Sequence, residues 1–322
     1  VCSSDLDYLA AFLPRYAYWA GNFSVLLNLR DQIPGLAKLS ELLLGFSSRR
    51  RLPRWRRDQF NAEKEISQQA SVEENAREVV LLVDTFNGCF EPENARAALA
   101  VLTAAGYKVR CPRPLDKGRP LCCGRTFLSG GLVNEARVEA ERMIDTLMPF
   151  VERGVPIIGL EPSCLLTLRD EFPSLLPGAD TDELAENAFL LEEFLAAEHG
   201  KGRLHLKLKP LPIKQALLHG HCHQKAFDVM SSVQQVLALI PDLELETIKS
   251  GCCGMAGAFG YDAKHYEISM KMGELNLLPA VRAADAVTLI IADGTSCRNQ
   301  IRDGTGREAM HVARVLEMAL SG

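Results

Sequence analysis

Eight cysteines of the 322-residue chain fall into two sets that share one order and nearly one spacing. Each set has a single cysteine, then an adjacent pair followed by glycine, then another single cysteine. The sets are Cys89, Cys122, Cys123 and Cys164, and Cys222, Cys252, Cys253 and Cys297. Matching members lie 133, 130 and 133 residues apart. Two sets in one register indicate an internal repeat.

Four thiolates brought together suit a soft cation, either Zn²⁺ or the iron of an iron–sulfur cluster. Zinc sites usually use short Cys-x-x-Cys segments, and the chain has none. Adjacent cysteine side chains diverge, so they are easier to place on a cluster of several metals than on one tetrahedral ion. The glycine after each pair lets the backbone turn tightly. Inert buried thiols and a thiol–disulfide enzyme that uses the adjacent pairs remain alternatives.

Basic side chains surround the first cysteine of the second set. They are His219, His221, His223 and Lys225. On an extended strand end, the three histidines would lie on one side and Cys222 on the other. Each histidine alone is equally well explained as structural, but together they could support a cluster or carry protons. The first set has arginines nearby and no histidine, so we expect the second set to be the working one if only one is loaded.

Composition describes an ordinary globular protein of about two domains, with 47% hydrophobic and 24% charged residues. A net charge of −5 argues against nucleic acid as the main partner. We find no secretory signal and no apolar run long enough to span a bilayer. We therefore expect a cytoplasmic location, where thiols stay reduced and serve metal or redox chemistry.

Short apolar runs alternate with amphipathic segments from residue 78 onward. We expect strands at 79–83, 107–110, 155–160, 216–219, 243–248 and 287–292, and helices from Pro92 and at 132–152, 165–171, 182–198, 224–239, 262–283 and 307–320. This alternation predicts an α/β fold of two pseudo-symmetric repeats with parallel sheets and flanking helices. Each cysteine set then follows strand ends, where ligands collect, in one pocket per repeat. Residues 188–191 and 309–312 look like matching positions on the last helix of each half.

These patterns divide the chain into three parts. Residues 1–76 form a small helical connector and linker, 77–208 the first cysteine-rich repeat and 209–322 the second. Residues 1–6 resemble a translated sequencing adapter, so we expect Cys2 not to be native and the natural chain to begin further upstream. The arginine-rich segment 49–57 is interpreted as a solvated linker, or else as a docking site for anionic lipid or for a second protein, anchored by Trp55. Cys111 fits neither set and is expected to be a core or loop thiol.

The two cysteine motifs resemble the duplicated cysteine-rich CCG domain. This domain occurs in heterodisulfide reductase, in the iron–sulfur subunits of glycolate oxidase and anaerobic glycerol-3-phosphate dehydrogenase, and in lactate-utilisation proteins. Residues 84–87, 119–127, 160–164, 219–225 and 292–297 are similar to the C-terminal part of fused FAD/iron–sulfur dehydrogenases of D-2-hydroxy acids (D-lactate or D-2-hydroxyglutarate). In the fullest motif each half ends in Cys-x-x-Cys, but here Glu161 and Gly294 replace the first of those cysteines. An ordinary [4Fe–4S] cluster or a mononuclear metal therefore becomes more plausible than a noncubane cluster.

The resemblance implies an iron–sulfur electron-transfer module of a flavin-dependent 2-hydroxy-acid dehydrogenase. FAD and ferredoxin-like clusters in a missing N-terminal part, on the same polypeptide or complex, would supply electrons for a quinone, cytochrome or other acceptor. The eight cysteines would be the metal ligands, supported by the three histidines and Lys225, and no residue here would oxidise the hydroxy acid. The resemblance also allows peripheral contact with the inner face of the membrane. The alternatives are a structural or assembly domain with a single metal or a vestigial site, and a thiol–disulfide (heterodisulfide) reductase-like module.

Overall fold

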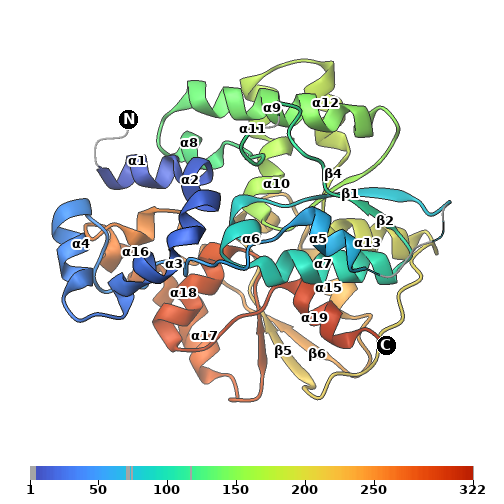
Figure 1. Ribbon diagram of the computed structural model, residues 1–322. Coiled ribbons are helices and arrows are strands. Elements are labelled where there is room, and N and C mark those ends of the chain that lie inside the picture. The colour runs from blue at the N-terminus through green and yellow to red at the C-terminus, as the bar shows by residue number, and fades with distance from the viewer. Residues whose placement is uncertain (1–4, 70–72, 74, 117, 322) are drawn as a thin grey trace.

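Two parallel sheets form the framework of the computed structural model, which describes residues 5–69, 73, 75–116 and 118–321 (Figure 1). The first sheet has the order β2-β1-β3-β4 and the second the order β6-β5-β7. Their strands are β1 Glu78–Leu82, β2 Lys108–Arg110, β3 Ile157–Gly159, β4 Ala188–Leu190, β5 Gln215–Leu218, β6 Glu244–Thr247 and β7 Leu289–Ile291. Every pairing between these strands is parallel. The predicted α/β fold with parallel sheets is confirmed.

Helices flank both faces of each sheet. Those of residues 77–208 are α6 Thr85–Cys89, α7 Pro92–Ala104, α8 Arg125–Ser129, α9 Val133–Val151, α10 Pro162–Arg169, α11 Glu171–Leu175, α12 Ala179–Glu186 and α13 Leu191–Gly200. Those of residues 209–322 are α14 Cys222–Ala226, α15 Met230–Leu237, η3 Phe259–Tyr261, α16 Tyr266–Glu274, α17 Leu277–Ala283, α18 Thr295–Thr305 and α19 Val312–Ala319. In both halves the third strand in chain order, β3 or β7, leads into a helix that carries a cysteine, α10 or α18.

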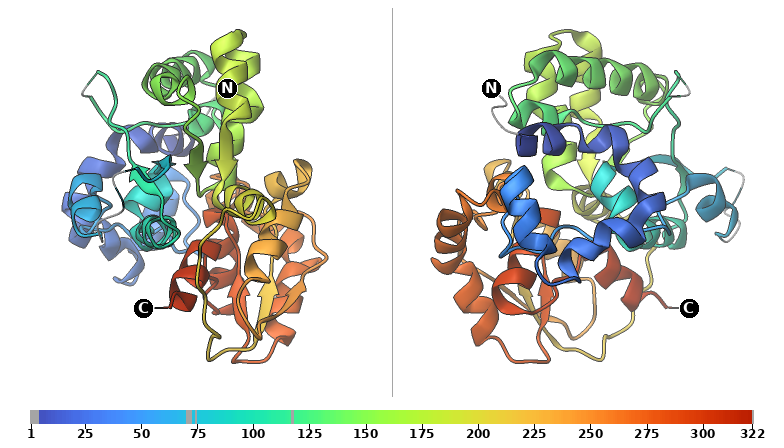
Figure 2. Two further views of the ribbon diagram at one scale, coloured as in Figure 1. Left: turned by 90° about the vertical axis from the view of Figure 1, so that its right-hand side faces the viewer. Right: turned by 60° about the vertical axis from the view of Figure 1, so that its left-hand side comes forward.

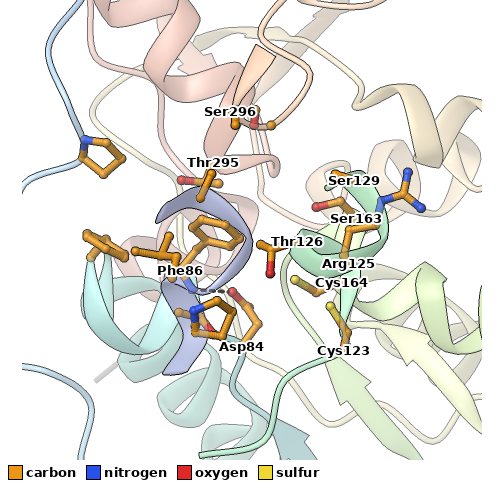
Figure 3. A pocket seen from close by; sticks show the side chains of 18 of the residues that line it. Asp84, Phe86, Cys123, Arg125, Thr126, Ser129, Ser163, Cys164, Thr295 and Ser296 are labelled. Carbon is orange, nitrogen blue, oxygen red and sulfur yellow. Dashed lines mark hydrogen bonds between the residues drawn. The ribbon is translucent and has the colours of Figure 1, made fainter. Parts of the chain in front are cut away.

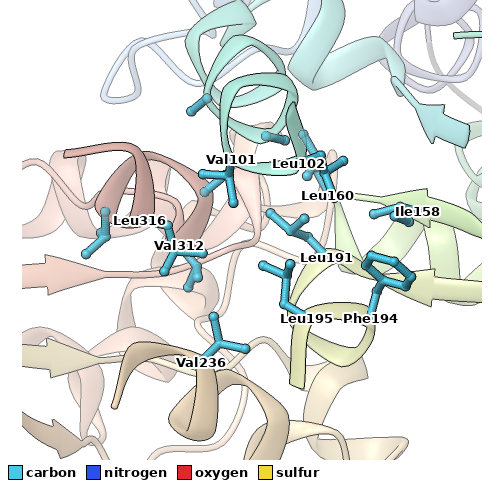
Figure 4. Packing of buried hydrophobic residues seen from close by; sticks show 14 of the residues in the cluster. Val101, Leu102, Ile158, Leu160, Leu191, Phe194, Leu195, Val236, Val312 and Leu316 are labelled. Carbon is cyan, nitrogen blue, oxygen red and sulfur yellow. The ribbon is translucent and has the colours of Figure 1, made fainter. Parts of the chain in front are cut away.

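The two halves share one apolar core (Figure 4). Helix α7 of the first half packs on α19 of the second, and α13 of the first half packs on α15 of the second. The side chains between them include Leu102, Leu195, Val236 and Leu316, all buried. Because each half supplies one helix to each contact, the sheets are held in a fixed relation, and their carboxyl ends meet near the centre of the molecule.

Several expected helices differ from those observed. The expected helix 182–198 is interrupted by β4, which pairs with β3 through Phe189 and Ile158. Residues 188–190 and Met310 do occupy corresponding places, as an edge strand paired with β3 and as a bridge to Ile291 of β7. Only Leu191 and Val312 lie on helices, as the first residues of α13 and α19. Helix 307–320 begins only at residue 312, and α18 before it was not predicted. Helix 224–239 is broken where Asp228 adopts a positive φ of 55°.

The N-terminal segment forms an outer layer across both halves (Figure 2). It contains α1 Asp5–Ala11, α2 Leu13–Ala20, η1 Gly21–Phe23, α3 Ser24–Leu27, η2 Asn28–Asp31, α4 Leu36–Leu44 and α5 Ala62–Ser67. Helix α1 packs on α8 of the first half, whereas Phe46 bridges to Asp262 of the second. Residues 1–4, with Cys2 of the adapter-like segment, lie outside the described residues. Within the described residues, no helix combines the length and apolarity that crossing a bilayer requires.

The arginine-rich segment 49–57 is not a solvated linker. Arg50 is fully buried and donates hydrogen bonds to the Gly260 carbonyl (2.6 Å) and to Ser269 Oγ (2.8 Å). Trp55 packs against Phe90, with ring centroids 4.9 Å apart, so it faces the protein and is wrong as a lipid anchor. This segment therefore ties the N-terminal layer to the loop after the second cysteine pair.

Candidate metal centre

The four thiols of the second set meet at the carboxyl edge of the second sheet. Cys222 begins α14 after β5, Cys297 is the third residue of α18 after β7, and the adjacent pair lies in the loop after β6. Hydrogen bonds link Cys222 to Cys252, Cys252 to Cys253, and Cys253 to Cys297. Cysteines separated by up to 75 residues thus form one continuous chain of thiols.

Local interactions hold the cysteine pair of this set in place. Gly254 has a φ of +91°, and a Cβ there would lie 2.3 Å from the Ser269 carbonyl oxygen, so only glycine fits. The Gly254 N–H donates to Cys252 Sγ at 3.4 Å. Lys225 Nζ donates to the carbonyls of Ser250 (2.6 Å) and Gly251 (3.1 Å), which fastens the loop to α14. The lysine that the sequence identified as a local positive charge therefore also positions the loop.

Hydrogen bonds divide the second set into two donors and two acceptors. The bond from Cys222 lowers the pKa of Cys252, and the bond from Cys253 lowers the pKa of Cys297. The bond to Cys252 raises the pKa of Cys222, and the bonds to Cys252 and to Cys297 raise the pKa of Cys253. His221 also lowers the pKa of Cys252 and of Cys297. Two thiols of this set are therefore stabilised as thiolates, the form that binds metal.

The histidines do not alternate around Cys222 as expected. The strand ends at Leu218, and His223 lies with Cys222 inside α14, so His221, Cys222 and His223 line the same cavity. His221 Nδ1 accepts a hydrogen bond from the His223 N–H (3.2 Å) and caps the helix. His219 Nδ1 contacts Ser250 Oγ (2.9 Å), and the His219 side chain also hydrogen-bonds to Cys297.

Three thiols of the first set also meet. Cys123 hydrogen-bonds to Cys122 and to Cys164, and the Gly124 N–H donates to Cys122 Sγ at 3.3 Å, as in the second set. The surroundings, however, are acidic. The bond from Cys123 lowers the pKa of Cys164, but burial and the carboxylates of Asp84 and Glu161 outweigh it and raise that pKa to about 12. The pKa values of Cys122, Cys123 and Cys164 are therefore all raised, whereas those of Cys252 and Cys297 in the second set are lowered.

Cys89 lies apart from the other thiols of its set. It is the last residue of α6 and packs in an apolar cluster with Ala17 and Phe90, and burial and Asp84 raise its pKa to about 12. No hydrogen bond among the described residues joins it to another thiol. In the second half, Cys222 is the first residue of the corresponding helix, and in the first half that position is Thr85. The equal sequence offsets therefore do not correspond to equal positions in the fold.

One cavity of about 490 Å³ receives thiols of both sets. The cysteines that line it are Cys122, Cys123, Cys164, Cys222, Cys252 and Cys253. The expectation of one pocket per repeat is thus wrong, because the carboxyl edges of the two sheets face each other. Figure 3 shows Cys123 and Cys164 on one wall, Phe86 projecting into the cavity, and Thr295 of the second half nearby. The N-terminal layer closes the cavity with apolar side chains such as Leu13 and Trp55.

Direct contacts join the two halves beside the thiols, and sequence reasoning missed them. Glu161 Oε2 accepts a hydrogen bond from the Thr295 N–H at 2.8 Å. Arg298 Nε donates to Glu91 at 2.8 Å; Arg298 follows Cys297 on α18, and Glu91 lies two residues after Cys89. Arg125 approaches His223 Nε2 at 3.3 Å. The one sequence signal was the departure from Cys-x-x-Cys at residues 161 and 294, which was interpreted only as the loss of a thiol.

The donor chemistry of the second set fits a soft metal. Each of the four thiols is within hydrogen-bonding reach of the next, and the His219 side chain hydrogen-bonds to Cys297 and lowers its pKa. Within residues 5–69, 73, 75–116 and 118–321, no group of three or more His, Cys, Asp or Glu side chains is arranged to hold a single metal ion. The thiols form a chain instead of surrounding one point.

The fold and this site define an α/β module that gathers cysteine pairs from two facing sheets. Residues 216–302 match the family described as Cysteine-rich domain, CCG. This match contains Cys222, Cys252, Cys253 and Cys297, so the resemblance to the CCG domain drawn from the second motif is confirmed.

Curated relatives extend the match over most of the chain. One subunit of the anaerobic glycerol-3-phosphate dehydrogenase of Escherichia coli (strain K12) is 28% identical over 308 residues, which cover 93% of this chain and 73% of the relative. D-2-hydroxyglutarate dehydrogenase of the same strain is 25% identical over 326 residues, covering 96% of this chain but 30% of the relative. Lactate utilization protein A of Bacillus subtilis (strain 168) is 28% identical over 255 residues, covering 74% of this chain and 98% of the relative. These names associate the chain with oxidoreductases.

Proposed function

We propose that the chain is the iron–sulfur electron-transfer module of a flavin-dependent dehydrogenase of 2-hydroxy acids. In this proposal it receives electrons from FAD and ferredoxin-like clusters in other domains of the same polypeptide or complex. It delivers them to a quinone, a cytochrome or another carrier. The names of the relatives support dehydrogenase chemistry, and the relative named for D-2-hydroxyglutarate supports a hydroxy acid as substrate.

The observation that carries the proposal is the convergence of four thiols from separate segments in the second half. Buried thiols that serve packing alone do not need to touch one another, whereas thiols that share a ligand must converge. A [4Fe–4S] cluster bound there would supply one-electron transfer at a potential set by its surroundings. Cys222, Cys252, Cys253 and Cys297 would hold it.

The surroundings of the second set support it as the loaded site. His219, His221, His223 and Lys225 lie around it. Lys225 would offset the charge of thiolates, whereas burial lowers the pKa of His221 and lowers that of His223 to about 4, so these two rings would act as neutral hydrogen-bonding groups. The first set faces Asp84 and Glu161 and has Thr85 where the second has Cys222. Cys89, Cys122, Cys123 and Cys164 remain candidate ligands of a second group, but only three of them lie together.

The common plan of the halves supports an internal duplication. In both sheets the first strand of the half lies between the second and third, and each cysteine pair precedes a glycine with positive φ. We therefore keep the division into 1–76, 77–208 and 209–322, although α7 and α19 bind the halves into one core. A cytoplasmic location with contact at the inner face of the membrane belongs to the same proposal.

Iron and acid-labile sulfide, measured after anaerobic purification and reconstitution, test the proposal. We expect both in about equal amounts, with a visible absorption band that bleaches on reduction and an EPR signal of the reduced protein. Cys111→Ser is the matched control, because Cys111 is a partly buried thiol outside both sets. Zinc, or no metal, would support the structural role instead. A disulfide that titrates reversibly without iron would support a thiol–disulfide reductase.

A further inference from the structure

Exposed large apolar side chains are concentrated on the N-terminal layer. The most exposed are Trp19 (65%), Val25 (65%), Leu26 (65%), Leu42 (83%) and Leu43 (63%), with Tyr18, Phe23, Ile33 and Leu39 also exposed. They lie on α2, η1, α3 and α4 or beside them, and these elements pack on one another in sequence. The right-hand view of Figure 2 shows that the N-terminal helices α2, α3 and α4 lie on one outer side of the molecule. We call this set of side chains the apolar face.

Basic side chains border the apolar face. Residues 5–57 carry nine basic and four acidic side chains, in a chain whose net charge is −5. Segment 50–55 runs beside η2, because Leu52 N–H donates to Asp31 Oδ2 (2.9 Å) and Trp55 N–H donates to Asn28 Oδ1 (2.9 Å). The exposed Arg51 and Arg54 of this segment therefore lie close to the apolar residues on either side of η2.

We propose that the apolar face docks the protein on the surface of a bilayer that contains anionic phospholipid. Short helices that expose leucine, valine and tryptophan on one side, next to arginines, have the character of segments that lie in the membrane interface. Leucine and valine insert among acyl chains, tryptophan and tyrosine suit the headgroup level, and arginine binds lipid phosphates. A protein partner would be a weaker match, since binding hot spots are poor in leucine and valine.

Docking in this orientation would bring the thiol cavity close to the membrane. Leu13, Tyr16, Phe46 and Trp55 line the cavity from the inner side of the same layer. The inference deepens the membrane contact in the proposed function, on which it rests, but it does not require a bound cluster. Vesicle binding and iron content can therefore fail independently of each other.

Cosedimentation of the full chain with vesicles tests the inference. We expect binding to vesicles of phosphatidylcholine with phosphatidylglycerol, weaker binding to phosphatidylcholine alone, and weakening by salt. The variant Leu26→Glu/Leu42→Glu should lower the bound fraction by roughly tenfold or more, since each change removes a leucine from the membrane and adds a negative charge. Val287→Glu is the matched control, because Val287 is 74% exposed and lies just before β7 in the second half, outside the N-terminal layer; it should bind as the unchanged chain does.

Two results would overturn the inference. One is the absence of binding to either kind of vesicle at low salt. The other is binding that Leu26→Glu/Leu42→Glu leaves unchanged. Sedimentation velocity of the same proteins without vesicles tests whether the apolar face binds a second copy of the chain. Self-association of the unchanged chain that Leu26→Glu/Leu42→Glu abolishes would identify a second copy as the partner of this face, and would also overturn the inference. Unchanged thermal melting of the variant shows that it is folded.

Discussion

The side chain of Glu161, whose pKa is raised to about 8 by burial and by Asp84, accepts a hydrogen bond at Oε2 from the backbone N–H of Thr295, the first residue of the helix that carries Cys297 (2.8 Å). The N-cap residue of that helix is Gly294, which has no side chain to cap it. Glu161 and Gly294 are the two departures from the full cysteine motif. A carboxyl oxygen from one half thus satisfies the helix N-terminus that the other half leaves open.

Replacing Glu161 tests this contact. Glu161→Ala should lower the free energy of unfolding by about 1–3 kcal/mol, because it leaves a buried N–H without an acceptor. Glu161→Gln keeps an amide oxygen in place of the carboxylate and should lose much less. Urea denaturation of both variants gives the comparison. Equal losses in the two variants would mean that Glu161 does not act as the cap.

Gly294 and His221 should be coupled. A Cβ at Gly294 would lie 2.3 Å from His221 Cδ2, although its φ of −75° is open to any residue. We expect Gly294→Ala to lower stability by about 1–3 kcal/mol through this overlap. His221→Ala removes the ring, so the double variant should lose less than the sum of the single ones. Additive losses in a double-mutant cycle would contradict the overlap.

The pair Arg298–Glu91 should contribute strongly to stability. Arg298 is buried and also donates to the carbonyls of Ala292 (2.9 Å) and Asp293 (2.5 Å) at the end of β7. Arg298→Ala should cost about 3–5 kcal/mol, because Glu91 keeps its charge without its partner. Arg282→Ala, at an exposed pair with Glu274, is the control and should cost less than about 1 kcal/mol. Similar losses of unfolding free energy in Arg298→Ala and Arg282→Ala would contradict the larger contribution expected from the buried pair.

Glu198 should make stability depend on pH in the acid range. Burial raises its pKa, but hydrogen bonds from Arg203, Arg77 and Tyr107 outweigh burial and lower the pKa to about 2. Because the pKa of Glu198 is lower in the folded than in the unfolded chain, its ionised form stabilises the fold at pH values above the unfolded pKa, near 4.5. This contribution to stability disappears as the pH falls towards 2. Because both arginines are half exposed, we expect about 1–2 kcal/mol.

The measurement for Glu198 is the difference in unfolding free energy between the unchanged chain and Glu198→Gln across pH. This difference should be constant from about pH 7 to 5 and should shrink below about pH 4. A difference that stays constant down to about pH 3 would show that ionised Glu198 contributes nothing.

The strands were predictable where burial on both faces leaves an unbroken apolar run. Segment 79–82 and β7 are of this kind, since parallel strands covered by helices show no alternation. Strand β4 was not predictable from the sequence alone. Its three residues lie between two helices, and only pairing with β3 makes them a strand. Tertiary pairing thus overrides local pattern at the edge of the sheet.

The second thiol set was predictable and the first only in part. Strand ends converge in a parallel sheet, so Cys222, Cys253 and Cys297 had to approach one another. Spacing could not show that Cys89 lies a turn further along its helix than Cys222 does. It also could not show that the two sheet edges face one cavity, because this depends on the packing of α7 on α19.

The iron content of Cys253→Ser and Cys123→Ser, each reconstituted anaerobically beside the unchanged chain, tests the central claim most directly. The account predicts about four irons per unchanged chain, near-complete retention in Cys123→Ser and loss of iron and of the EPR signal in Cys253→Ser. Full retention of iron in Cys253→Ser, or its loss only in Cys123→Ser, would contradict the assignment of the cluster to the second set.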